Sequence, residues 1–199
     1  TGEKMELDGY NFIEGDNVAV YDHMGRHMLC TMVQTNKPAE EQAHNVAMQV
    51  AAMNPVALDE ASVPQEVKDE ELKVAIEKTK EEQVKKAVEA AIKKAGYNAY
   101  IAESEEHLEE GIRKGNITEE DAAAIRELKA KTAEEKSANL PEQMVQNIAN
   151  GRMKKFYKES CLLNQEYIQD SKQTVAEYLK STDKDLTVTA FKRFTLRAE

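Results

Sequence analysis

Tryptophan is absent from this sequence, aromatic residues make up only 6% of it, and cysteine occurs twice in 199 residues. Two cysteines cannot build a disulfide scaffold or a cysteine-rich metal cluster, and Cys30 and Cys161 also lack the spacing of metal ligands. We expect both to be reduced and to serve as small apolar residues of a cytoplasmic protein. A disulfide between these two cysteines is the disfavoured alternative.

Long apolar runs and positive charge are also scarce. No run approaches the roughly 20 apolar residues of a membrane span, and no charged-then-apolar leader stands at the start. The formal net charge of −10 makes direct contact with DNA or RNA unfavourable. Because the sequence opens with Thr1 instead of methionine, we expect an N-terminal portion that precedes it.

Signatures of catalysis are missing as well. The sequence has no Gly-rich phosphate loop, HExxH helix or GxSxG elbow. His23, His27 and His44 could in principle hold a metal ion, but no acidic or fourth ligand lies at a suitable spacing, so surface or half-buried histidines are the favoured interpretation. We expect no catalytic residue, no metal and no cofactor, and an enzyme is the weaker class.

The sequence is rich in charged helical stretches, of which the longest runs from Val63 to Ala95. Glu81 precedes Lys85 by one helical turn, the favourable order for an ion pair on a solvated face. Pro64 suits the first turn and Gly96 the position after the last, which predicts a helix on the order of 48 Å long. Its narrow apolar seam is expected to consist of Val67, Val74, Val84, Val88, Ile92 and Ala95.

A second apolar-periodic stretch, Leu140 to Phe156, can lie back against the first and form an antiparallel helical hairpin. Its seam is expected to be Met144, Val145, Ile148, Met153 and Phe156. Between the two, residues 96–139 hold few large apolar residues, with a helix capped by Ser104 and another opened by a capping box at Thr118–Asp121. We expect a small helical extension at the tip of this hairpin.

The two ends of the chain are β-rich and predict one small body. A β-hairpin is expected with its tip at His23-Met24-Gly25, followed by a helix over Ala39–Met53, and after the arm by a short helix over Val175–Lys180 and a strand over Leu186–Leu196. The predicted fold class is α+β: a small antiparallel sheet covered by helices, with an inserted antiparallel helical hairpin, or coiled coil.

Phe191 breaks the alternation of the last strand, whose even positions are mostly apolar and whose odd positions are mostly polar. Packing beneath a helix or beside a neighbouring strand is the favoured interpretation of Phe191. Contact with a partner is the alternative, and Phe191 is kept as a candidate partner-binding residue.

Several segments of the sequence form an ordered series: His44 to Pro55 with Val63 to Val67, then Gly151 to Phe156, Leu162 to Ile168, Lys172 to Val175, and Val188 to Phe194. In order and spacing, this series resembles the bacterial translation elongation factor Ts family. The resemblance does not extend over residues 96–139, which look like a lineage-specific enlargement of the coiled-coil tip.

The resemblance implies part of a guanine-nucleotide exchange factor for elongation factor Tu, in its GDP-bound and nucleotide-free states. Residues 1–61 and 157–199 would be the C-terminal subdomain of the dimerisation core, and residues 62–156 the inserted coiled-coil arm, with the extension at 96–139. The family's Thr-Asp-Phe-Val motif does not occur in these 199 residues. This half is therefore expected to act as a docking surface.

Tyr21 to Gly25 occupy the place of a family hairpin that faces the partner, so His23, Met24 and Gly25 are the first candidate interface residues. The sequence leaves one rival open, because an amphipathic helical hairpin with a narrow seam can also pair between chains. In that alternative the protein is a self-associating homodimer without exchange activity.

Overall fold

The computed structural model describes residues 2–7 and 9–196, which form two compact units. The first unit comprises the described parts of 1–68 and 154–199, and the second comprises 69–153. Each unit has its own buried apolar side chains. The interpretation of residues 1–61 and 157–199 as a subdomain of a dimerisation core stays a prediction.

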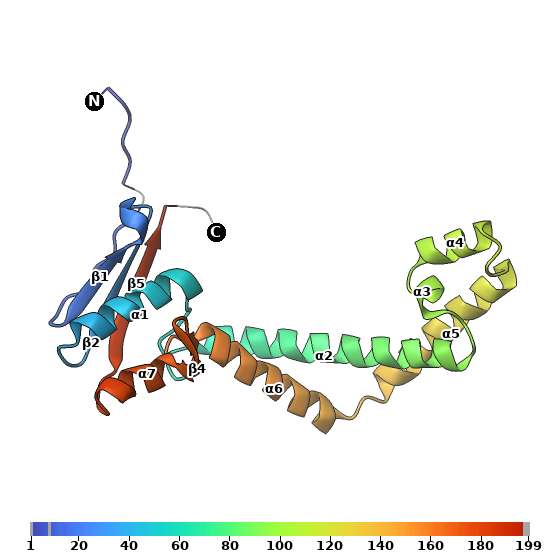
Figure 1. The fold of residues 1–199 in the computed structure, drawn as a ribbon. Coiled ribbons are helices and arrows are strands. Elements are labelled where there is room, and N and C mark those ends of the chain that lie inside the picture. The colour runs from blue at the N-terminus through green and yellow to red at the C-terminus, as the bar shows by residue number, and fades with distance from the viewer. Residues whose placement is uncertain (1, 8, 197–199) are drawn as a thin grey trace. The chain divides into compact units, whose positions relative to one another are not determined.

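A three-stranded antiparallel sheet forms the centre of the first unit (Figure 1). Its strands are β1 (Val18–Asp22), β2 (Leu29–Thr35) and β5 (Val188–Thr195), in the order β1-β2-β5. A single turn of 3-10 helix, His23–Gly25, connects β1 to β2. The predicted combination of an early hairpin and the last strand is confirmed, so β1 and β5 are the two edges of this sheet.

Helices α1 (Glu40–Met53) and α7 (Val175–Thr182) supply further residues to the core of this unit. The core joins β2 and β5 to the apolar stripe of α1, and Thr31 on β2 also donates to the carbonyl of Ala47 at 2.7 Å. Fully buried side chains of this cluster include Val33, Val46, Val50, Leu162, Val175 and Leu179. The α+β class and the covering of this sheet by α1 are as expected.

The two faces expected for the last strand are wrong over most of its length. A register irregularity in the β2–β5 ladder pairs Thr35 with Val188 and Gln34 with Ala190, so Thr189 is an extra residue. Such a bulge reverses which residues point to which face. Phe191 therefore lies opposite buried Val33 and packs against the core cluster.

A second, two-stranded sheet was not predicted. It pairs β3 (Glu166–Tyr167) with β4 (Asp170–Thr174). The fully buried side chain of Gln49 on α1 ties it down: its amide nitrogen donates to the Glu166 carbonyl at 3.1 Å, and its oxygen accepts from the Ile168 amide at 2.8 Å. A buried amide with both ends bonded costs little and fixes the hairpin on α1.

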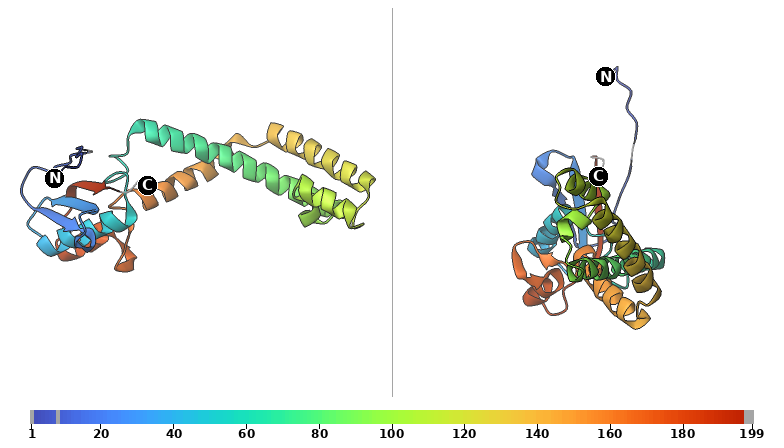
Figure 2. Two further views of the ribbon diagram at one scale, coloured as in Figure 1. Left: turned by 90° about the horizontal axis from the view of Figure 1, so that it is seen from above. Right: turned by 90° about the vertical axis from the view of Figure 1, so that its right-hand side faces the viewer.

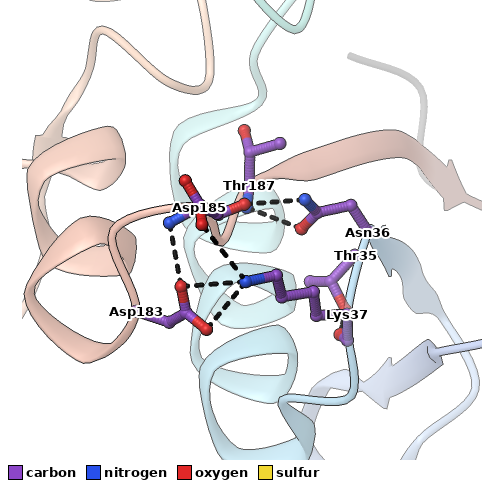
Figure 3. A network of polar contacts seen from close by, with 6 residues as sticks. All are labelled: Thr35, Asn36, Lys37, Asp183, Asp185 and Thr187. Atoms are coloured by element: carbon purple, nitrogen blue, oxygen red, sulfur yellow. Dashed lines mark hydrogen bonds and ion pairs between the residues drawn. The ribbon is translucent and has the colours of Figure 1, made fainter.

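A polar network joins the end of β2 to the loop before β5 (Figure 3). Asn36 donates to the carbonyl of Asp185 at 2.7 Å and accepts from the amide of Thr187 at 2.9 Å. The Lys37 ammonium reaches both carboxylate oxygens of Asp183, at 3.0 and 2.9 Å. The pKa of the Asp183 carboxyl lies below its ordinary value. The main cause is the hydrogen bond that the amide of Asp185 donates to it, and the second is the Lys37 ammonium.

In the second unit, most of the long helix α2 (Gln65–Lys94) lies with the larger part of α6 (Glu142–Ser160). The two helices cross in the left-hand view of Figure 2. Small residues fill the buried positions of their middle turns: Ala75, Thr79 and Ala149. Arg152 donates to Glu82 at 2.6 Å one turn farther along each helix, which identifies this as the place where α2 and α6 meet.

The seam expected for these helices is partly wrong. Ile92 on α2 and Val145 and Met153 on α6 are buried as predicted. Ala95, by contrast, lies beyond the end of α2 and is exposed. Ala75, Thr79 and Ala149 were missed because a search for large apolar residues ignores small ones, although small side chains let two helices approach closely.

Three further helices complete the second unit: α3 (Ala99–Ala102), α4 (Glu105–Arg113) and α5 (Glu119–Ala138). The predicted Ser104 cap and the Thr118–Asp121 capping box are both present. The short helix α3 was not predicted. These helices share a small cluster whose buried members are Ile92, Ala102, Leu108, Ala122 and Ile125.

Candidate partner-binding site

The tip of the β1–β2 hairpin presents an apolar side chain on an unusual backbone. Met24 and His27 have φ of 60° and 56°, and Gly25 has 63°, all in the left-handed region. For the two residues with a Cβ this conformation costs roughly 1–2 kcal/mol each. The Met24 side chain is 70% exposed, so this costly backbone conformation places an apolar side chain in solvent and not in the core.

Two polar contacts hold the tip in this conformation. The Asp22 carboxylate accepts from the amide of His27 at 2.9 Å and contacts Nδ1 of the His27 imidazole. On the other side, the Tyr21 hydroxyl hydrogen-bonds Nδ1 of His23 at 3.0 Å. Asp22 also lies opposite Cys30 in the ladder. The pKa of the Cys30 thiol is raised, mainly by burial and secondly by the negative charge of Asp22. The tip is therefore fixed by its own side chains.

A groove of about 940 Å³ lies beside the hairpin, between the edge of β1 and the first two turns of α1. Val18, Ala19 and Val20 form one wall. The other wall consists of Pro38, Ala39, Glu40, Glu41, Ala43, His44 and Asn45. The groove is thus apolar along the strand and mixed in polarity along the helix.

Tyr21 connects the hairpin tip to this groove. Its ring meets the imidazole of His23 at the tip with centroids 5.9 Å apart, and the imidazole of His44 on α1 with centroids 5.6 Å apart, both edge to face. Aromatic side chains of this kind are common at the centre of protein interfaces. The tip and the groove therefore form one continuous candidate surface on the first unit.

Of the residues predicted as partner-binding, the structure brings His23, Met24 and Gly25 together at the tip. Phe191 is not with them, because it lies opposite Val33 while the ladder pair closest to the tip is Leu29 with Thr195. Its role in partner contact stays a prediction. Tyr21, His44 and the β1 edge were not named as interface residues, although an apolar edge strand without proline or lysine is a signal that the sequence does carry.

No cluster of three or more metal-ligating side chains occurs within residues 2–7 and 9–196, and His23, His27 and His44 make the contacts given above instead. Among the helices that the structure describes, none combines the length and apolarity needed to cross a membrane.

Comparison with known proteins gives a consistent result over the whole chain. The sequence model of the family described as elongation factor TS matches residues 1–105 and 108–198. Elongation factor Ts of Phocaeicola vulgatus is 60% identical over 199 residues, which are 100% of this chain and 60% of that protein. Elongation factor Ts of Bacteroides fragilis is 60% identical over 200 residues, covering 100% of this chain and 61% of that protein.

A more distant relative, elongation factor Ts of Porphyromonas gingivalis, is 34% identical over 200 residues, covering 100% of this chain and 52% of that protein. The chain thus spans about 60% of the length of the first of these relatives. The family match includes most of 96–139, a region that the resemblance was expected to leave out. With the family model matching nearly every residue, this chain belongs to the elongation factor Ts family.

Proposed function

We propose that this chain is the docking half of a guanine-nucleotide exchange factor and binds elongation factor Tu through the hairpin tip and the adjoining groove. Family membership supports the choice of partner. The observation that carries the choice of surface is Met24, an exposed apolar side chain held outward on a left-handed backbone. Because polar contacts already hold the backbone of the tip, binding needs to order little main chain there, which favours affinity.

The same proposal assigns no covalent chemistry to this chain. An exchange factor acts by binding the nucleotide-free state of its partner better than the nucleotide-bound state. The family's motif for disturbing the nucleotide site, Thr-Asp-Phe-Val, does not occur in these 199 residues. We therefore expect this chain to bind elongation factor Tu without accelerating GDP release by itself.

The surface assignment is tested by titration calorimetry with elongation factor Tu. Replacing His23 and Met24 together by alanine should weaken binding by roughly 1–3 kcal/mol, as expected for residues at an interface centre. Met53→Ala is the matched control, because Met53 is also an exposed methionine but lies at the end of α1. Equal affinities of the parent and the double variant, with folding intact, would remove the tip from the interface.

A further inference from the structure

The two edges of the three-stranded sheet differ in how they are protected. β5 carries Lys192 and Arg193 and contains the bulge at Thr189, features with which natural edge strands avoid pairing with other chains. β1 has the sequence Val-Ala-Val-Tyr-Asp and pairs with β2 over five residues without an irregularity. One edge is blocked, and the other is left regular and apolar.

The ladder shows which backbone groups of β1 face this open edge. The amide of Thr35 donates to the carbonyl of Asn17 at 3.1 Å, so the backbone groups of Asn17 point toward β2. Hydrogen-bonding direction alternates along an antiparallel strand, so Ala19 and Tyr21 also point toward β2. The amides and carbonyls of Val18 and Val20 consequently point away from it, into the groove.

The groove along this edge has the features of a receptor for an extended chain. A strand added beside β1 would lie about 4.7–4.9 Å from it, with the first turns of α1 along one of its faces. Val20 is 61% exposed on the opposite face and would contact the side chains of the added strand that lie next to it on that face. Main-chain hydrogen bonds would supply affinity, and these side-chain contacts would supply specificity.

Charge indicates what kind of strand fits. Glu40 and Glu41 line the groove, both are exposed, and neither has a cationic partner in the part of the chain that the structure describes. A strand with a lysine or arginine facing α1 would neutralise them. A second copy of this chain would instead bring its own Glu40 and Glu41 and its own net charge of −10, which disfavours pairing of two β1 strands.

We propose that β1 binds elongation factor Tu by strand addition: an extended segment of that partner, apolar at alternate positions and carrying a basic residue, pairs with the free edge of Val18–Asp22. This proposal rests on the proposed function and specifies how the same surface binds. It predicts that Val18 and Val20, and not Ala19, gain hydrogen bonds in the complex.

The first measurement is amide hydrogen exchange of the whole chain, free and saturated with elongation factor Tu. In the free chain the amides of Ala19 and Tyr21 should be protected, and those of Val18 and Val20 should exchange fast. In the complex all four should be slow. If Val18 and Val20 stay fast in the complex, strand addition is wrong.

A pair of variants tests the same point by calorimetry. Val20→Pro removes one outward amide without removing a bond to β2, which is where proline is tolerated in a sheet. It should weaken binding by about tenfold or more, since the partner's carbonyl loses its donor. Val20→Thr keeps the amide and the β-branched shape, so it should weaken binding less than Val20→Pro does.

Protection of the Thr31 and Val33 amides reports whether each variant is folded, and Val20→Lys, which retains the amide but adds edge charge, replaces the proline variant if it is not. If the parent and the folded edge variant, Val20→Pro or its replacement Val20→Lys, bind equally well, strand addition is overturned and the proposed function stands. If the parent does not bind elongation factor Tu, both fail together. Protection of Val18 and Val20 that rises with chain concentration in the absence of partner would identify a second copy as the occupant and overturn the proposal.

Discussion

The hydrophobic clusters of the two units are built differently. In the first unit, residues from β2, β5, α1 and α7 meet in one cluster with many fully buried side chains. In the second unit, the cluster around Leu108 and Ile125 has few buried members, two of which are alanines. The fold of the first unit therefore depends mainly on the burial of apolar side chains, whereas the helices of the second depend more on polar contacts near helix ends.

Helix caps and polar contacts between helices stabilise α3, α4 and α5. Asn98, Ser104 and Thr118 each accept a backbone amide as N-caps of α3, α4 and α5. The Lys129 ammonium donates to the carbonyl of Ala102 at 2.6 Å, and Arg126 donates to Glu105 at 2.9 Å. A rigid, well-buried unit is the better support for an interface that must be held in one geometry, which agrees with the placement of the candidate site on the first unit.

The largest effect is expected when one large apolar side chain of each cluster is shortened to alanine. Leu179→Ala in the first unit should cost about 2–5 kcal/mol, because the side chain is fully buried and its neighbours come from several elements. Ile125→Ala in the second unit should loosen α3, α4 and α5 but leave the amides of β2 as protected as in the parent. The measurement is hydrogen exchange resolved by residue. Loss of β2 protection in Ile125→Ala would mean that the two clusters do not respond separately.

A smaller effect is expected from the two capping boxes, which offer a matched pair. Thr118 is the N-cap of α5 and Thr174 is the N-cap of α7. Each threonine side chain accepts from the amide of the acidic residue three positions on, whose carboxylate accepts from the threonine amide. Replacing either by alanine should cost about 1 kcal/mol. Because Val175 and Leu179 of α7 belong to the main cluster, Thr174→Ala should lower the unfolding midpoint of the first unit. Thr118→Ala should accelerate exchange in α5 alone, and equal effects on both units would contradict the comparison.

The smallest expected effect concerns acid. The pKa of Asp183 lies below its ordinary value of 3.8 in the folded chain, so this carboxylate adds stability above that value and loses it as pH falls through the lower folded pKa. Glu82 of the second unit behaves in the same way, because Arg152 lowers the pKa of that carboxyl. Asp183→Asn should reduce the acid sensitivity of the loop before β5, and Glu82→Gln that of the α2–α6 contact. Acid titration followed by NMR checks both, and an unchanged profile in either variant would show that its ion pair does not couple to folding.

The sequence predicted the elements whose signals are local. The hairpin tip, α1, α7 and the caps at Ser104 and Thr118 follow from turn residues, 3.6-residue periodicity and side chains that bond nearby amides. The three predicted residues of the tip also come together, because they are adjacent in the chain.

The features that the sequence did not predict depend on pairing between distant segments. The extra residue Thr189 is visible only when β5 is aligned with β2, and without it Phe191 would face the other side of the sheet. The β3–β4 hairpin depends on Gln49, more than a hundred residues earlier in the chain. Likewise, the groove exists only because α1 lies beside the free edge of β1.

Release of a fluorescent GDP analogue from elongation factor Tu, measured with and without this chain at concentrations that saturate binding, tests the docking account most directly. We predict that the chain binds and that the release rate stays at its intrinsic value. Faster release in proportion to the bound chain would contradict the account, because contact through the hairpin tip and groove would then be enough to disturb the nucleotide site.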